Sequence, residues 1–136
     1  MKKTVFLLLC AISLKAQTIK SSGTYFIDGV NDKGWSNTNG DGFTSAKFKS
    51  YSGTSYVIIE VTKDVTVNFK ANSRLKAGEL EFKLIDEQDN EYFSCKTTKA
   101  CELTKEVRLV KNQKYKLLMK GEDARGTYQA NWEIIN

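Results

Sequence analysis

Apolar and polar residues alternate along most of the chain from residue 54 onward, and this alternation constrains the fold more than any other feature. In the segment GELEFKL, for example, Leu80 and Phe82 alternate with Glu81 and Lys83. Successive side chains of a β-strand point to opposite faces of its sheet, so a period of two is typical of strands with one buried face. No segment after the first sixteen residues repeats its apolar residues at the spacing of a helix. We therefore expect strands and almost no helix.

Turn-forming polar residues divide this alternating region into short strands. We expect one hairpin of residues 57–61 and 65–71, and a second that turns at 86–90 and continues through Tyr92. Further short strands flank turns at 111–113 and 121–126. About seven to nine strands at regular spacing are typical of a sandwich or small barrel. The sequence therefore predicts an all-β fold, an antiparallel β-sandwich of the jelly-roll or immunoglobulin-like kind.

Residues 17–53 lack this regularity. They are rich in Gly, Ser, Asn and Asp, which favour turns and loops. We expect two short strands there, near residues 24–28 and 44–50, separated by a long connection. A chain of 136 residues suits a single domain. We therefore assign residues 17–136 to one sandwich domain whose N-terminal part, residues 17–53, is rich in loops.

The beginning of the chain has the plan of a signal peptide. Two lysines precede an uncharged run at residues 4–14, and a small residue, Ala16, follows. The run is shorter than the roughly 20 apolar residues that a membrane-spanning helix needs. We therefore predict a signal peptide at residues 1–16, no transmembrane span, and a secreted, periplasmic or cell-surface protein.

The formal charge of +5 falls when such a leader is removed. The chain has 21 Lys and Arg against 16 Asp and Glu, and three of the lysines lie in the leader, which leaves 18 against 16. Nucleic-acid binding needs a clustered basic face that neutralises phosphates. The remaining lysines mostly alternate with apolar residues along the expected strands, as on solvated faces. We therefore do not expect nucleic acid as a partner.

Cys95 and Cys101 are the only cysteines outside the leader. Export favours oxidation of such a pair. The two residues flank a short polar loop, KTTKA, and a loop of that size can bring two Cα atoms within the roughly 4.4–6.8 Å that a disulfide requires. We predict a Cys95–Cys101 bridge, with two free thiols as the alternative. Cys10 would suit a lipoprotein leader, but the large Leu9 before it disfavours lipidation.

The C-terminal segment GEDARGTYQANWEI carries a family resemblance. Gly126, Tyr128 and Trp132 form a Gly-x-Tyr-x-x-x-Trp pattern. Through this pattern, residues 54–136 resemble small exported bacterial β-sandwich domains of unknown function. The resemblance implies a jelly-roll or immunoglobulin-like sandwich and transfers no catalytic residue. Trp132 continues an alternating apolar row, so we expect it to be buried.

The chain contains no histidine. This absence excludes Ser-His-Asp and Cys-His hydrolases, HExxH metalloproteases and the usual zinc sites. Paired carboxylates are the remaining catalytic resource, but the Asp and Glu residues of the expected strands lie opposite lysines and are typical of solvated surface. We therefore predict a protein that is not an enzyme, with a small carboxylate-dependent hydrolase as a remote alternative.

The stretch NTNGDG, residues 37–42, is similar to the first half of an EF-hand calcium loop. Such loops place oxygen ligands at positions 1, 3 and 5, glycine at 6 and glutamate at 12. Asn37, Asn39 and Asp41 match the first three ligands, but position 12 falls on Phe48. The other interpretation is a turn in which Asn and Gly adopt positive φ. We favour the turn, and calcium is the one cofactor that the sequence suggests.

Trp35 lies in a polar stretch, NDKGWSNTNGDGF, where its ring could stack on a sugar or fill a partner's pocket. The other interpretation, which we favour, is that it closes one end of the sandwich. The residues of the predicted ligand-binding surface are Trp35, Phe43, Tyr51, Asn37, Asn39 and Asp41. The expected function is a secreted, non-catalytic binding module for carbohydrate or another cell-surface polymer. A structural or protein-interaction domain that acts through a sheet edge or an apolar patch is the alternative.

Overall fold

The computed structural model describes residues 18–135, which form seven β-strands and no helix. In chain order the strands are β1 (Ile19–Lys33), β2 (Ser36–Gly40), β3 (Phe43–Val61), β4 (Val65–Ile85), β5 (Glu91–Thr97), β6 (Ala100–Leu109) and β7 (Lys114–Ile135). All of the strand pairs are antiparallel. The predicted all-β sandwich and the number of strands are confirmed. The prediction of short strands is wrong for β3, β4 and β7, which contain 19, 21 and 22 residues.

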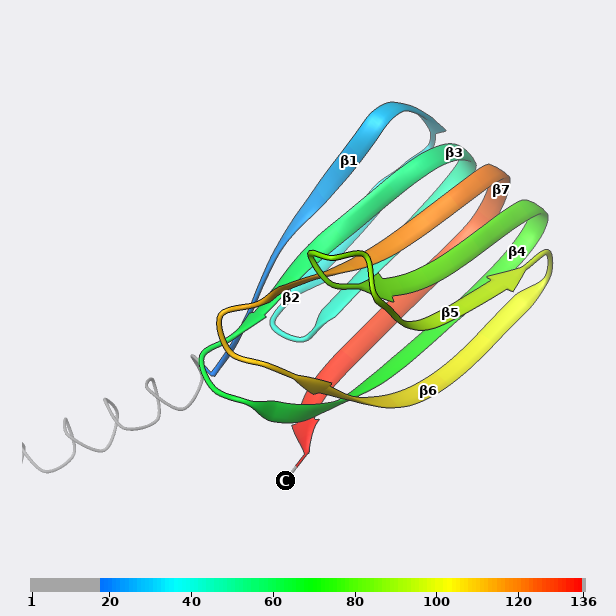
Figure 1. Cartoon of the computed structure of the whole chain (residues 1–136). Helices are drawn as coiled ribbons and strands as arrows, with labels where there is room; N and C mark the ends of the chain where they lie inside the picture. Colours follow the sequence, from blue (N-terminus) through cyan, green and yellow to red (C-terminus); the bar gives the residue numbers. More distant parts are fainter. Residues whose placement is uncertain (1–17, 136) are drawn as a thin grey trace, which may run out of the picture.

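These three long strands bend and pass through both layers of the sandwich (Figure 1). In β3, residues 54–60 pair with the first half of β7, whereas residues 43–48 pair with its second half. In β4, residues 66–74 pair with β6 and the second half of β7, and residues 80–85 pair with β5 and the first half of β7. The first layer therefore has the strand order β1–β3–β7–β4–β5, and the second layer has the order β2–β3–β7–β4–β6.

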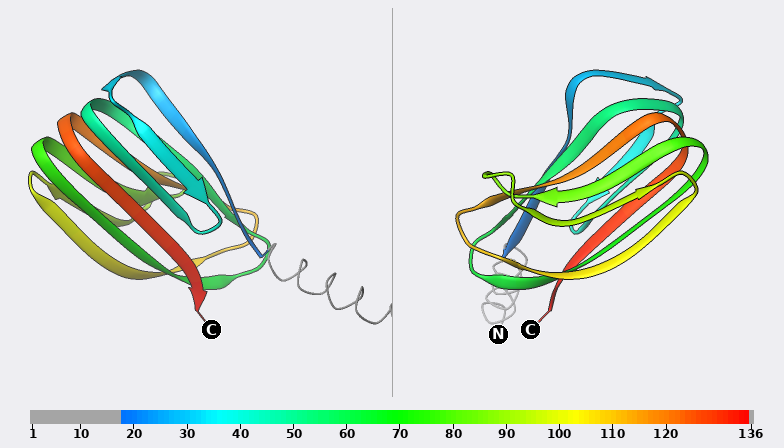
Figure 2. Two further views of the ribbon diagram at one scale, coloured as in Figure 1. Left: turned by 180° about the vertical axis from the view of Figure 1, so that it is seen from behind. Right: turned by 45° about the vertical axis from the view of Figure 1, so that its right-hand side comes forward.

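All of the bends lie at one end of the molecule, at the upper right in Figure 1, and Figure 2 shows them from two further sides. The register between β3 and β7 shifts at Phe48, Tyr51 and Gly53, and the register between β4 and β7 shifts from Leu75 to Glu79. β-bulges of this kind bend a strand and increase its twist. At the two edges the chain also passes from one layer to the other, but here the strand is interrupted, between β1 and β2 at one edge and between β5 and β6 at the other.

Two glycines allow β4 and β7 to approach each other closely at their bends. Gly126 has a φ of 148° and Gly78 a φ of 78°. A Cβ on Gly126 would lie 2.0 Å from the carbonyl oxygen of Arg74, and a Cβ on Gly78 would lie 2.1 Å from that of Asp123. Glycine alone tolerates both the backbone angles and the contacts.

Every second residue of the paired strands points into the space between the layers. The rows that the alternation predicts to be apolar are buried: Leu80 and Phe82 are 0% exposed, Tyr128 is 1% exposed and Trp132 is 4% exposed. Fully burying a large apolar side chain contributes about 1.5–3 kcal/mol relative to its exposure. The predicted burial of Trp132 is therefore confirmed, and the core extends through both layers.

Two of the expected turns between paired strands instead connect the layers. Residues 62–64 join β3 in the first layer to β4 in the second, and these strands do not pair. Residues 110–113 likewise join β6 to β7, and residues 121–126 are a bend within β7 rather than a turn. A crossing and a hairpin have similar turn residues, so the alternation could not distinguish them. The hairpin of β4 and β5 at residues 86–90 is confirmed.

The prediction of a loop-rich segment at residues 17–53 is wrong. β1, β2 and the first part of β3 occupy most of it. β1 and β2 are edge strands, and four of the five residues of β2 are exposed. An edge strand is held by backbone hydrogen bonds on one side and buries few side chains. Its sequence therefore lacks the apolar row by which the other strands are recognised.

The predicted disulfide is confirmed. Cys95 of β5 and Cys101 of β6 are bonded, with their Cα atoms 6.5 Å apart. Because β5 pairs in the first layer and β6 in the second, the bond joins the two layers at this edge of the sandwich.

The predicted signal peptide at residues 1–16, with Cys10, lies outside the described residues. Within residues 18–135 no helix has the length and hydropathy needed to cross a membrane.

Candidate functional site

Tyr51, one of the predicted ligand contacts, is a core residue. Its side chain is 0% exposed. Its hydroxyl donates to the carbonyl oxygen of Met119 at 2.5 Å and lies 3.0 Å from Ser55 Oγ. The prediction that Tyr51 meets a ligand is therefore wrong. It rested on the loop that was expected before residue 54, whereas this residue lies at the bend of β3 and points inward.

Trp35 is partly buried and belongs to an aromatic cluster at the bends. Its ring stacks on Phe48 with a centroid distance of 5.8 Å and an interplanar angle of 17°, and it contacts Tyr51 at 5.0 Å and Tyr128 at 6.0 Å. Its Nε1 donates to Asn37 Oδ1 at 3.2 Å. Trp35 thus covers one end of the core, as the favoured interpretation of this residue expected.

The stretch NTNGDG forms β2 and a tight turn at Asp41 and Gly42, where Gly42 has a φ of 83°. The Asn37 and Asn39 amides donate to Thr24 Oγ1 of β1 at 3.2 and 3.0 Å. Asn39 Oδ1 accepts a hydrogen bond from Thr44 Oγ1 at 2.6 Å. The side-chain oxygens of two of the three candidate calcium ligands are therefore engaged by donors within the protein. Among the side chains that the structure describes, which exclude those of residues 28–32, no three His, Cys, Asp or Glu side chains gather as metal ligands do.

Of the three predicted aromatic site residues, Phe43 is the one that is exposed, whereas Trp35 is partly buried and Tyr51 is buried. Phe43 begins β3, points away from the core and is 36% exposed. It borders a hollow of about 570 Å³ on the outer face of the second layer, which we call the amide groove. The residues that line the groove are Asp41, Gly42, Phe43, Asn68, Lys70, Gln129, Asn131, Trp132 and Glu133.

Strand pairing arranges the groove residues in rows across the sheet. One row runs Gly40, Phe43, Asn131, Lys70 and Thr104. The next row runs Thr38, Ser45, Gln129, Asn72 and Glu102. Neighbouring strands lie about 4.8 Å apart, so each row presents polar groups at short, regular intervals. Amide and hydroxyl groups both donate and accept hydrogen bonds.

A smaller hollow of about 200 Å³ adjoins the amide groove at the edge between β1 and β2. It shares Asp41, Phe43 and Trp132 with the groove and adds Asn39 and residues 21–23 of β1. The structure thus brings Asn39, Asp41 and Phe43 together at the two hollows. Asn37 bonds to Trp35 and shares Thr24 with Asn39, and neither Asn37 nor Trp35 lines these hollows.

The alternating pattern alone did not identify the amide side chains Asn68, Gln129 and Asn131 as site residues. They occupy the polar positions of alternating strands, which were interpreted as solvated surface. The signal was present in their type, because these positions carry amides where other strands carry Lys and Glu. Nothing in the sequence showed that β4 and β7 would place them in adjacent rows.

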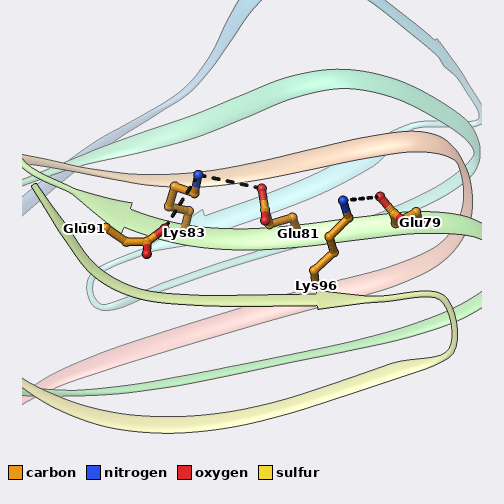
Figure 3. Close-up of polar contacts among 5 residues, drawn as sticks. All are labelled: Glu79, Glu81, Lys83, Glu91 and Lys96. Carbon is orange, nitrogen blue, oxygen red and sulfur yellow. Dashed lines mark ion pairs between the residues drawn. The ribbon is translucent and has the colours of Figure 1, made fainter. Parts of the chain in front are cut away.

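The outer face of the first layer has a different chemistry, because its charges pair with one another (Figure 3). Lys96 Nζ lies 3.1 Å from Glu79 Oε1, and this partner raises the pKa of Lys96. Lys83 Nζ lies 3.6 Å from Glu91 Oε1 and 4.0 Å from Glu81 Oε1. Among the residues lining the amide groove, by contrast, the described structure has one side-chain hydrogen bond, from Gln129 Nε2 to Asn131 Oδ1 at 3.4 Å. The polar groups of the groove are therefore more available to a ligand.

Asp86 is a carboxyl group whose pKa is lowered, and its partners indicate a structural role. The Tyr92 hydroxyl donates to Asp86 Oδ2 at 2.7 Å, and the backbone N–H groups of Gln88 and Asn90 donate to Oδ1 at 2.9 and 3.0 Å. Chiefly through Tyr92, these bonds lower the pKa of Asp86 from 3.8 to about 2. A general acid needs a raised pKa, so this carboxylate secures the turn of the β4–β5 hairpin.

No family model and no curated protein matches this chain. Solved structures with a similar fold include a CBM4 carbohydrate-binding module, at 14% identity and a TM-score of 0.44 over 86% of this chain and 83% of that one. They also include the CBM35 module from Cellvibrio japonicus Abf62, at 10% identity and a TM-score of 0.45 over 85% and 87% of the two chains. A carbohydrate-binding module of Cellvibrio mixtus lichenase 5A, in complex with cellotriose, has 11% identity and a TM-score of 0.43 over 86% and 95%. Similarity at these values does not assign the chain to any of those families.

Proposed function

We propose that this protein is a secreted, non-catalytic binding module that holds a carbohydrate chain in the amide groove. The observation that carries the proposal is the groove itself, in which Asn68, Gln129 and Asn131 lie beside the exposed ring of Phe43. An aromatic ring offers an apolar face to a sugar. Amide side chains offer donors and acceptors that match the hydroxyl groups around it.

The rows of the groove suit a chain that lies across the strands. One row links Phe43 to Asn131 and Asn131 to Lys70 on three adjacent strands. With strands about 4.8 Å apart, successive sugar units of an extended chain would meet successive strands.

Two features support the proposal that the protein acts outside the cytoplasm. The plan of residues 1–16 predicts export. The Cys95–Cys101 disulfide is of a kind that persists in oxidising compartments. Surface polysaccharides are the ligands that such a location would offer.

Affinity electrophoresis against a panel of cell-wall and host glycans tests the proposal. The protein should be retarded by at least one glycan, and Phe43→Ala and Asn131→Ala should each abolish the retardation without lowering stability. Val110→Ala is the matched control, because Val110 is an apolar residue of similar exposure, 38%, outside the groove. No retardation by any glycan, or equal losses in the control, would contradict the proposal. Release of reducing ends from the bound glycan would instead support the hydrolase alternative.

One observation favours the second candidate function, a protein-interaction domain. β1 is an edge strand, and three consecutive residues of it, Tyr25, Phe26 and Ile27, are 42%, 46% and 43% exposed. An exposed apolar edge is a template for adding a strand from another chain. Light scattering over a range of concentrations tests this function. Association that Ile27→Lys abolishes would favour it, and a monomer at all concentrations with no glycan bound would contradict both functions.

A further inference from the structure

Each of the five strand paths of the sandwich carries an exposed cation where it passes from one layer to the other. The paths are β1 with β2, β3, β7, β4, and β5 with β6, in this order across the sheet. We call their cations the basic ridge, and in the same order they are Lys33, Lys49, Arg125, Lys76 and Lys99. All five side chains are exposed.

Strand pairing makes the basic ridge continuous. The backbone contacts that link each bend to the next are Lys33 with Ser50, Tyr51 with Ala124, Arg125 with Ala77, and a 2.7 Å hydrogen bond from Leu75 N to the Lys99 carbonyl. With strands about 4.8 Å apart, the five paths span roughly 20 Å. The cations are far apart in sequence, so their alignment appears only in the folded chain. The alternation of lysines with apolar residues predicts basic residues dispersed over solvated faces, whereas at the bends they are gathered.

The cations of the basic ridge form no ion pair with the side chains that the structure describes, which do not include those of residues 28–32. Of the four ion pairs within 4.0 Å among the described residues, none includes a ridge cation. Lys47 and Arg74, which point outward beside the ridge in the second layer, also have no such partner there. The acidic residues at the bend of β7 are Glu122 and Asp123, and Asp123 accepts a hydrogen bond from Ser52 at 3.3 Å. An unneutralised row of cations attracts anions.

A hollow of about 430 Å³ lies at the Lys99 end of the basic ridge. Arg74 and Lys99 line it, together with Glu102 and Ser73. Ser73 is 1% exposed and points between the layers, opposite to Arg74, so its hydroxyl is not offered to a ligand on the surface. The two cations can donate strong, charge-assisted hydrogen bonds to a carboxylate or sulfate group.

We propose that the basic ridge binds a linear anionic polysaccharide, at a site separate from the amide groove. A line of cations at short intervals matches charges that recur along an extended chain. A lipid surface instead requires a broad basic face with apolar residues that enter the bilayer. Single-stranded nucleic acid is held by aromatic rings that stack on its bases, so its binding is an outcome that the test must distinguish.

Two triple variants with the same loss of charge test the proposal. The ridge variant combines Lys49→Gln, Lys76→Gln and Lys99→Gln. The control variant combines Lys20→Gln, Lys63→Gln and Lys105→Gln, at exposed lysines outside the ridge. Binding of polygalacturonate and of heparin is measured by calorimetry at NaCl concentrations from about 50 to 200 mM, the range over which such binding weakens steeply.

The ridge variant should lose about tenfold or more in affinity, and the slope of log K against log salt should become shallower by about 2, because three counterion-releasing contacts are removed. The control variant should bind like the wild type. Equal losses in both variants, or no binding by the wild type, would overturn the proposal. Tighter binding of a single-stranded oligonucleotide or of phosphatidylserine vesicles through the same lysines would also overturn it, in favour of that ligand. Phe43→Ala, which alters the amide groove, should leave this binding unchanged. The groove proposal and the ridge proposal can therefore fail independently of each other.

Discussion

Gly126 lies directly against the backbone of Arg74. A Cβ at position 126 would stand 2.0 Å from the Arg74 carbonyl oxygen and 2.9 Å from the Cα of Leu75. Gly126 also has a φ of 148°. We expect Gly126→Ala to lower the free energy of unfolding by about 3 kcal/mol or more, because two paired strands must move apart and the backbone is strained. Urea denaturation measures this loss.

Gly34→Ala is the control for this prediction. Gly34 has a φ of 64°, so alanine is again disfavoured, but the nearest atoms belong to the flexible side chain of Lys49 at 2.9 Å. That side chain can move away. The expected cost is about 1 kcal/mol, and similar losses in the two variants would show that the close approach of β4 and β7 is unimportant.

Trp35 and Phe43 should respond to substitution in opposite ways. Trp35→Ala removes a ring packed on Phe48 and Tyr128, so it should lower the free energy of unfolding by about 2–4 kcal/mol while the folded protein still binds glycan. Phe43→Ala should abolish binding and leave stability nearly unchanged. Denaturation and affinity electrophoresis of both variants provide the comparison. If Trp35→Ala removes glycan binding without changing stability, the ligand-binding surface lies at the bends and not in the amide groove.

The Cys95–Cys101 disulfide should contribute about 2 kcal/mol by restricting the unfolded chain, in keeping with the small loop that it closes. The double variant Cys95→Ala, Cys101→Ala should show this loss in urea denaturation. Thiol titration of the unfolded wild type should find these two cysteines unreactive until a reductant is added. Free thiols in the exported protein would contradict the bridge.

Asp86 should make the protein sensitive to acid. Its folded pKa, about 2, is below the usual value of 3.8. The ionised carboxylate therefore stabilises the fold at pH above about 4, and this contribution is lost as the pH falls from about 4 to 2. Asp86→Asn should show a flatter dependence of unfolding free energy on pH over this interval, and Tyr92→Phe should reduce the dependence in part. Equal slopes for the wild type and Asp86→Asn would exclude this role.

Calcium should not change the melting temperature. Asn37 Oδ1 and Asn39 Oδ1 already accept hydrogen bonds from Trp35 and Thr44. A ligand that binds only the folded state raises the free energy of unfolding by an amount that grows with the logarithm of the ligand concentration divided by Kd. Thermal denaturation with millimolar calcium and with a chelator gives the comparison, and a higher Tm in calcium would restore the metal-loop interpretation of residues 37–42.

The alternation of residues predicted the core but not the path of the chain. Leu80, Phe82 and Tyr128 are buried as expected, because each lies in an apolar row with a period of two. The same period continues through a bend, so residues 121–126, which were expected to form a turn between two strands, are a bend within the single strand β7. Edge strands escaped prediction for the converse reason, since β2 buries no apolar row.

The candidate site was only partly predictable for a related reason. Phe43 and Asp41 were identified from local features, an aromatic residue and a turn, and both line the groove. Asn68 and Asn131 meet them only because β7 lies between β3 and β4, a relationship between distant segments. Tyr51 was misplaced because the sequence could not show that β3 bends there and points its ring into the core.

Because β3, β4 and β7 each pass through both layers, neither half of this sandwich can melt while the other persists. Separating these strands in one layer would also disrupt the pairing of the same three strands in the other layer. Amide protons of β3, β4 and β7 in the two layers should thus be released to solvent together, in a single global event. Proteases should therefore cleave these three strands only after the whole sandwich has unfolded.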